Sequence, residues 1–165
     1  MTLKDRIKDD MKTAMKAGDS VARSTLTMLL SVIQNRELEK RSRLMKAGAT
    51  KEEDVAMQSL LSDDEIISAI SSEVKKRADS ISVYQQAGRT ELAAQEEEEQ
   101  KILSKYMPEQ MSEEDVRKIV ADVIAKTDAS GVKNMGAVMG AASSQTKGRF
   151  PGARLQEIVK SALGV

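Results

Sequence analysis

Apolar residues recur at helical spacing along most of the chain, and the pattern is interrupted at Pro108. An apolar residue at every third or fourth position places those side chains on one face of an α-helix. Proline lacks a backbone N–H and clashes with the preceding turn, so a helix seldom continues through it. No alternating run of strand length competes with this pattern. The sequence therefore predicts an all-α fold with an N-terminal domain of residues 1–107 and a C-terminal domain of residues 108–165.

About four helices are predicted in the N-terminal domain. Thr2 with Asp5 can cap the first helix, and Gly18 can end it. The other three begin near Ser20, Ser62 and Thr90. Their apolar faces are, in order, Leu3, Ile7, Met11 and Met15; Leu26, Leu29, Leu30, Ile33 and Leu38; Ile66, Ile70, Val74, Ile81 and Tyr84; and Leu92, Ile102, Leu103 and Tyr106. Residues 46–58 are polar with a weak apolar pattern, so we interpret them as a connection that can be partly helical.

A bundle of three helices is predicted in the C-terminal domain. Ser112 with Asp115 resembles a capping pair at the start of the first helix. The second helix follows Ser130 or Asn134 and has glycines one turn apart, and the third covers roughly residues 153–163. The buried face of the first helix is predicted from Val116, Ile119, Val120, Val123 and Ile124.

The composition excludes several classes of enzyme. The chain has no Cys and no His, which removes thiolate chemistry, the usual metal ligands and the usual general base near neutral pH. We therefore predict no metal and no cofactor. The charged N-terminus does not resemble a secretory signal, and no apolar run is long enough to span a membrane. A soluble cytoplasmic protein is expected.

Positive charge is concentrated near the C-terminus, although the whole chain is neutral. Residues 129–165 carry five basic side chains against Glu157 alone, a net charge of +4. Gly136 and Gly140 lie one turn apart within this segment, and the basic turn Lys147-Gly148-Arg149 follows them. A local basic surface of this kind is what binding to nucleic acid requires.

This tail resembles the C-terminal tail of the GatB/YqeY family, which includes the B subunit of the tRNA-dependent amidotransferase. The resemblance covers nearly the whole chain. It extends to Lys75-Lys76-Arg77 through Tyr84, Ala87-Gly88-Arg89, Tyr106-Met107-Pro108 and residues 112–115. It implies association with glutamine-dependent tRNA amidotransferase, a carbon–nitrogen ligase, but this chain lacks the parts that perform that chemistry. We therefore expect a YqeY-like protein that is non-catalytic on its own.

The resemblance and the charge together predict contact with tRNA or with a tRNA-modifying or aminoacylating enzyme. With only three aromatic residues, recognition would use phosphates and shape rather than base stacking. The candidate phosphate contacts are Lys133, Lys147, Arg149, Arg154, Lys75, Lys76 and Arg77. Each is also compatible with a merely solvated surface. A scaffold helix bundle without an RNA role, or an accessory factor in amidotransfer, are the alternatives, and the oligomeric state stays open.

Gly136 and Gly140 permit either tight helix packing or close approach of an RNA backbone. Two positions depart from the family pattern. Phe150-Pro151 follows the basic turn, and Thr27 stands where an arginine is expected. The first departure can alter the turn that presents Arg149, and the second removes a possible cationic contact in the N-terminal domain.

Three further motifs carry little chemistry. The spacing from Gly131 to Gly136 begins like a phosphate-binding loop but lacks its Lys and Ser/Thr. The consecutive residues of the acidic run 96–99 point in different directions around a helix, so we interpret the run as a solvated face. Ser144 with Lys147 could form a Ser–Lys pair, but both are expected to be exposed, whereas a catalytic lysine is activated by burial.

Overall fold

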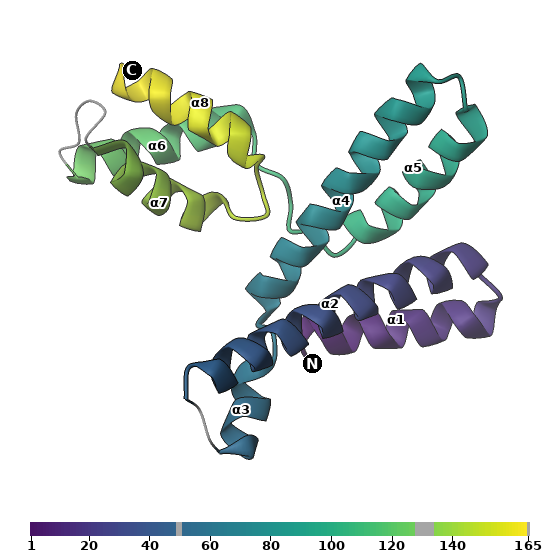
Figure 1. Ribbon diagram of the computed structural model, residues 1–165. Coiled ribbons are helices and arrows are strands. Elements are labelled where there is room, and N and C mark those ends of the chain that lie inside the picture. Colours follow the sequence, from purple (N-terminus) through teal and green to yellow (C-terminus); the bar gives the residue numbers. More distant parts are fainter. Residues whose placement is uncertain (49–50, 128–133, 165) are drawn as a thin grey trace. The chain divides into compact units, whose positions relative to one another are not determined.

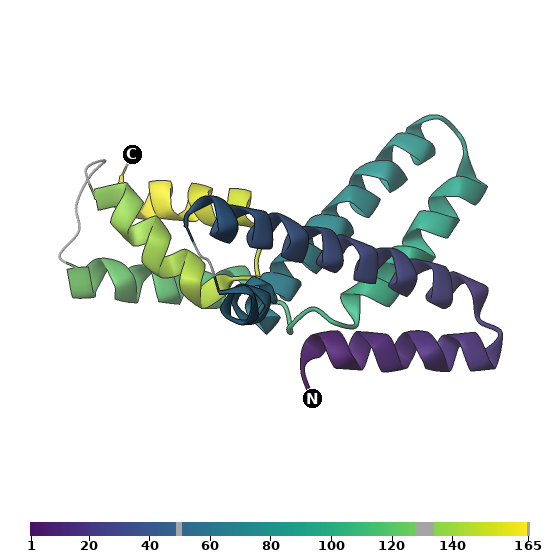
Figure 2. The ribbon, with the colours of Figure 1, turned by 60° about the horizontal axis from the view of Figure 1, so that its bottom comes forward.

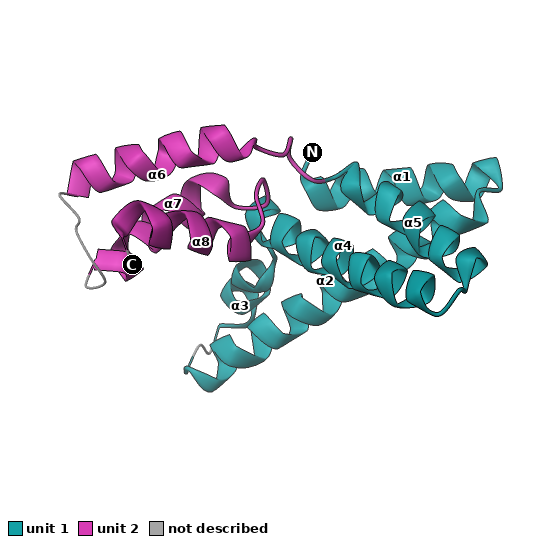
Figure 3. Ribbon diagram, turned by 90° about the horizontal axis from the view of Figure 1, so that it is seen from above, with its two compact units in different colours: residues 1–106 teal, residues 107–165 magenta. Residues whose placement is uncertain are grey.

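The computed structural model describes residues 1–48, 51–127 and 134–164, and Figure 1 shows that the fold is built from helices. No strand occurs in these ranges, which confirms the all-α prediction. The helices are α1 (Leu3–Ala17), α2 (Ser20–Lys46), α3 (Glu52–Ser59), α4 (Asp63–Gln86), α5 (Thr90–Ser104), α6 (Glu113–Thr127), α7 (Met135–Thr146) and α8 (Gly152–Leu163). They form two compact units, Met1–Tyr106 and Met107–Val165, which Figure 3 colours separately.

Local capping explains where several helices begin. The Thr2 side chain accepts a hydrogen bond from the Asp5 amide, and the Asp5 carboxylate accepts one from the Thr2 amide. Ser62 and Glu65 form the same reciprocal pair at the start of α4. Each pair satisfies backbone donors that have no partner within the helix. The helix starts predicted at Thr2 and Ser62 are therefore confirmed.

In the N-terminal unit, α1 runs alongside α2 and α4 runs alongside α5 (Figures 1 and 2). Helix α2 also contacts α3, α4 and α5, so it links the two pairs. The largest fully buried side chains of this unit are Ile7, Leu29, Ile33, Ile66, Ile70 and Leu103. All six belong to the apolar faces that the sequence predicts.

The end of the N-terminal unit is attached to α1. The Tyr106 hydroxyl donates a 2.7 Å hydrogen bond to Asp10, and the guanidinium of Arg6 lies 5.4 Å from the centre of the Tyr106 ring. Burial of the ring, reinforced by Asp10, raises the pKa of the Tyr106 hydroxyl. Tyr106 therefore remains protonated and can donate this bond at any physiological pH.

The helical part of the connection predicted at residues 46–58 is α3, which gives the described part of the unit five helices rather than about four. Its first turn carries Glu52, Glu53 and Asp54, whose charges favour a helix N-terminus. Only Val55 and Ser59 are buried, so the apolar pattern is too short to reveal this helix from the sequence.

Three predicted core residues are exposed, and one of them is Leu92 near the start of α5, at 38% exposure. Met15 is 54% exposed, and Ala14 takes its place in the core, because a strict four-residue spacing drifts by about 40° per step around a helix of 3.6 residues per turn. Leu38 is 55% exposed, beyond the buried part of α2 that ends at Ile33.

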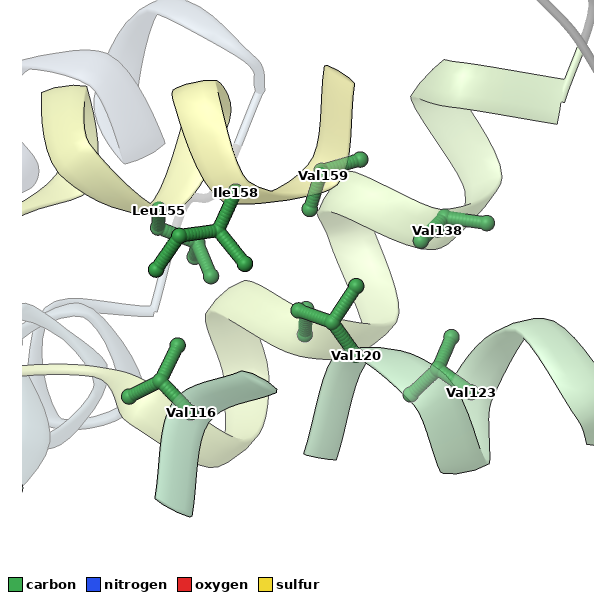
Figure 4. Close-up of a cluster of buried hydrophobic side chains, with 8 residues drawn as sticks. Val116, Val120, Val123, Val138, Leu155, Ile158 and Val159 are labelled. Carbon is green, nitrogen blue, oxygen red and sulfur yellow. The ribbon is translucent and has the colours of Figure 1, made fainter. Parts of the chain in front are cut away.

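The C-terminal unit is a three-helix bundle of α6, α7 and α8, as predicted. Its core is aliphatic and contains no aromatic ring among the fully buried side chains (Figure 4). The buried members are Val116, Val120, Val123, Val138, Ala142, Leu155, Ile158 and Val159. The Ser112 hydroxyl accepts a 3.1 Å hydrogen bond from the Asp115 amide, which confirms the predicted cap before α6.

Candidate nucleic-acid interface

The basic turn lies directly after α7 and is held by hydrogen bonds to the segment before α6. Gly148 has φ +71°, a left-handed conformation that lets the chain turn back without strain. The Gln110 side chain donates a 3.0 Å hydrogen bond to the Gly148 carbonyl, and the Met111 amide donates a 2.8 Å hydrogen bond to the Arg149 carbonyl. The Nε of Arg149 donates a 3.1 Å hydrogen bond to the Glu109 carbonyl. These three bonds fix the position of the turn within the C-terminal unit.

The cations of this turn differ in how far they are engaged. Lys147 is exposed and has no hydrogen bond or ion pair with any described residue. Arg149 is half-buried, and its Nη groups have no hydrogen bond within the described part of the chain. Both residues therefore retain donors that can reach a phosphate.

Arg154 is already paired with carboxylates. Its guanidinium donates two hydrogen bonds of 3.0 and 3.1 Å to Glu113 and a further bond to Glu157. These hydrogen bonds raise the pKa of Arg154, and the bond to Glu157 has the largest effect. Hydrogen bonds from Arg117 and then Arg154 lower the pKa of Glu113. An RNA phosphate at Arg154 would have to compete with two carboxylates, so Arg154 has a weaker claim than Lys147.

One predicted contact and one motif cannot be placed. Lys133 lies outside the described residues. The motif from Gly131 to Gly136 lies partly outside them.

Helix α7, next to the turn, has an uncharged surface of small side chains. It buries Val138, Ala142 and Thr146 and has no charged residue along its length. Its exposed side chains are small or polar and include Gly136, Ala137, Gly140, Ser143 and Ser144. A Cβ placed on Gly136 or Gly140 would meet no neighbouring atom of the described chain within 4 Å. Among the described residues these glycines therefore make no tight contact with a neighbouring element, and their face is open there.

Replacing Gly140 with Ala should therefore stabilise the C-terminal unit by about 0.5–1 kcal/mol, because alanine fixes an exposed helical backbone at less entropic cost. Chemical denaturation of the full chain measures this change. Gly148→Ala is the contrasting variant: it should destabilise the unit by about 1–2 kcal/mol, since its φ is positive. Destabilisation by Gly140→Ala would show that the residue packs closely against another part of the chain.

Phe150 and Pro151 leave the turn intact. Phe150 packs against the aliphatic core, and its amide donates 3.2 Å to the Thr146 carbonyl. Pro151 is the N-cap of α8. Phe150, which departs from the family pattern, therefore anchors the turn to the core. Thr27 is exposed on α2, where its hydroxyl donates 2.7 Å to the Arg23 carbonyl.

The predicted cationic group on α4 separates into different roles. Lys75 is exposed, and Lys76 is 68% exposed while pairing with Glu73 at 2.7 Å. Arg77 is only 12% exposed. Its guanidinium lies 2.9 Å from Glu99, 3.5 Å from Glu73 and 3.8 Å from Glu96. The assignment of Arg77 as an RNA contact stays a prediction, and it is weaker than that of the exposed Lys75, because the charge of Arg77 is held inside this carboxylate cluster.

The same cluster corrects the interpretation of the acidic run 96–99. Glu96 and Glu99 are largely buried at 24% and 19% exposure, and both face Arg77. Glu73 is 4% exposed, although charged residues are seldom buried without a partner. Arg77 also donates to the sulfur of Met28 at 3.0 Å, so it joins α2, α4 and α5.

The described residues contain no group of three or more His, Cys, Asp or Glu side chains placed to hold a metal ion. Ser144 is exposed and donates its hydroxyl to the Ala141 carbonyl at 2.8 Å. It is therefore not bonded to Lys147. None of the described helices is both long and apolar enough to cross a membrane.

Comparison with known proteins identifies relatives of this chain. A family model described as Yqey-like protein matches residues 4–163. The chain is also 31% identical over 101 residues to altered inheritance of mitochondria protein 41, mitochondrial, of Vanderwaltozyma polyspora. That match covers 61% of this chain and 46% of the relative, so the chain spans about half the length of the curated relative it matches. Because the family model extends over almost every residue, this chain belongs to the YqeY-like family.

Proposed function

We propose that this YqeY-like chain is a non-catalytic protein that contacts tRNA, or an assembly that aminoacylates or amidates tRNA, through phosphate-directed cations of its C-terminal unit. The observation that supports this most is the open, uncharged face of α7 next to Lys147 and the unengaged Nη groups of Arg149. Small side chains allow a nucleic-acid backbone to approach closely, and the adjacent cations can bind its phosphates.

The arrangement of the turn strengthens its candidacy. A lysine on an unrestrained loop loses conformational entropy when it binds, whereas the turn after α7 is already held by three hydrogen bonds. The flexible side chain of Lys147 thus extends from a backbone that is already held in place. Lys133 completes the proposed set, with Arg154 as a weaker member.

A second candidate function is a scaffold that binds another protein, including an accessory role in glutamine-dependent amidotransfer. The same face of α7 favours it, because a charge-free surface with glycines one turn apart also suits a close-packed partner helix. The two candidates differ in their dependence on salt. Only binding to phosphates releases counterions from the nucleic acid.

The test is a fluorescence-anisotropy titration of labelled tRNA with the full chain at several salt concentrations. We expect weak binding whose log affinity falls linearly with log salt concentration, by about 0.7 to 0.9 for each phosphate contacted. Several tRNAs should bind about equally, because phosphate contacts position a protein without reading sequence. Binding that ignores salt, or no binding at low ionic strength, would favour the scaffold.

A further inference from the structure

One side of the hairpin formed by α2 and α3 exposes large apolar side chains. Leu38 and Met45 on α2 are 55% and 59% exposed, and Leu60 at the end of α3 is 56% exposed. Scattered apolar residues are normal on a protein surface, but a contiguous group marks an interaction site. Whether these three form one group depends on which side of the hairpin each faces.

An ion pair between the two helices identifies that side. Arg41 of α2 lies 3.1 Å from Glu52 of α3. Residues three, four or seven apart share a helix face, so Leu38 and Met45 lie on the Arg41 side of α2. Ala56 and Leu60, four and eight residues after Glu52, lie on the matching side of α3. We call Leu38, Met45, Ala56 and Leu60 the hairpin face.

The hairpin face has a basic edge and an acidic edge. Lys46 is one residue beyond Met45, which turns it about 100° further from the ion pair, to the outer edge of α2. Glu53 occupies the corresponding outer edge of α3. Both side chains are exposed, and neither has an ion pair with any described residue. Figure 1 shows α3 lying against the end of α2, so the two edges flank one surface.

We propose that the hairpin face binds a second copy of this chain across a twofold axis. A twofold axis that lies in the plane of the face and runs parallel to the two helices places α2 of one copy on α3 of the other, so Lys46 meets the partner copy's Glu53 at both edges. The apolar side chains meet in the middle and leave water. The face is complementary to itself, whereas a strongly anionic partner such as a nucleic acid or a membrane would find no net attraction, because Glu52 and Glu53 balance the charges of Arg41 and Lys46.

The size of the surface sets the expected strength. A standard stable interface buries about 800 Å² on each partner. Helix α3 has eight residues, and only one face of it is available, so the contact is smaller than that standard. The dimer is therefore weak and reversible, and its population depends on protein concentration. It does not depend on the proposed contact with RNA.

The test is sedimentation equilibrium of the full chain without RNA, over about 1 to 300 µM, a range that covers weak affinities. The average mass of the wild type should rise from that of the 18.0 kDa monomer toward twice that value. Lys46→Glu and Glu53→Lys should each stay near the monomer mass, because like charges then meet twice. An equimolar mixture of the two variants should associate again, since both edge contacts of the mixed dimer become complementary.

Two controls keep the outcome decisive. Lys8→Glu makes the same charge change at an exposed site on α1 and should associate like the wild type. Leu38→Ser removes apolar area without changing charge and should weaken association in a chain with unchanged helical circular dichroism. A wild type that stays monomeric throughout the range, or a variant mixture that fails to associate, would overturn the proposal.

Discussion

Replacing Arg77 with Ala should lower the thermal midpoint of the N-terminal unit by roughly 15 °C or more. Removing one partner of a buried ion pair costs about 3–5 kcal/mol, because the remaining charges are buried without compensation. Here Glu73, Glu96 and Glu99 would lose the cation that they share. For a unit of this size each kcal/mol shifts the midpoint by about 4–8 °C. Thermal unfolding followed by circular dichroism measures the effect.

Lys76→Ala is the matched control for Arg77→Ala. Lys76 is the adjacent cation and also pairs with Glu73, but its side chain is 68% exposed. An exposed pair contributes about 0–1 kcal/mol, so the midpoint should move by only a few degrees. Equal effects of the two variants would mean that Arg77 is a surface residue and would strengthen its assignment as an RNA contact.

Replacing Ile158 with Ala should unfold the C-terminal unit while the N-terminal unit remains folded. Truncating a buried isoleucine costs about 2–5 kcal/mol, and a core as small as this one supplies only about 3–5 kcal/mol. Amide hydrogen exchange should then become fast throughout α6, α7 and α8 and stay slow in the core of α1, α2, α4 and α5. Binding to tRNA should be lost at the same time if the C-terminal unit carries it.

Gln156→Ala on the same helix is the control, because Gln156 is exposed. It should leave hydrogen exchange unchanged. If Ile158→Ala instead accelerated exchange equally in both units, the chain would unfold as one cooperative body, and the division predicted at Pro108 would have no thermodynamic meaning.

The parts of the fold that the sequence predicts are those determined by local interactions. Thr2 with Asp5 and Ser112 with Asp115 are capping pairs within three residues, and the structure contains both. Leu26, Leu29 and Ile33 on α2 are buried as expected, and Leu30 is partly buried. Leu38 continues that pattern, yet it is exposed, because periodicity states which residues share a face but not whether another element covers that face.

The sequence misses contacts at the candidate site for the same physical reason. Glu73 and Arg77 are four residues apart on one helix face, and Glu96 and Glu99 share a face of the next helix. This spacing offered a signal for the carboxylate cluster, but the match between two helices depends on their packing. The bond from Arg149 to the Glu109 carbonyl joins residues 40 positions apart, and a backbone acceptor has no sequence signature. Likewise, glycines one turn apart look the same whether a partner covers them or not.

The most direct test of the account compares the salt dependence of tRNA binding between the wild type and a variant with Lys133, Lys147, Arg149 and Arg154 changed to Ala. The control variant is Lys75→Ala with Lys76→Ala, which leaves the structural Arg77 in place. The log–log slope should flatten by at most roughly three units in the first variant, at about 0.7 to 0.9 per lost phosphate contact, and should not change in the control. A wild-type slope retained by a folded four-alanine variant would contradict the assignment of RNA contact to the C-terminal unit.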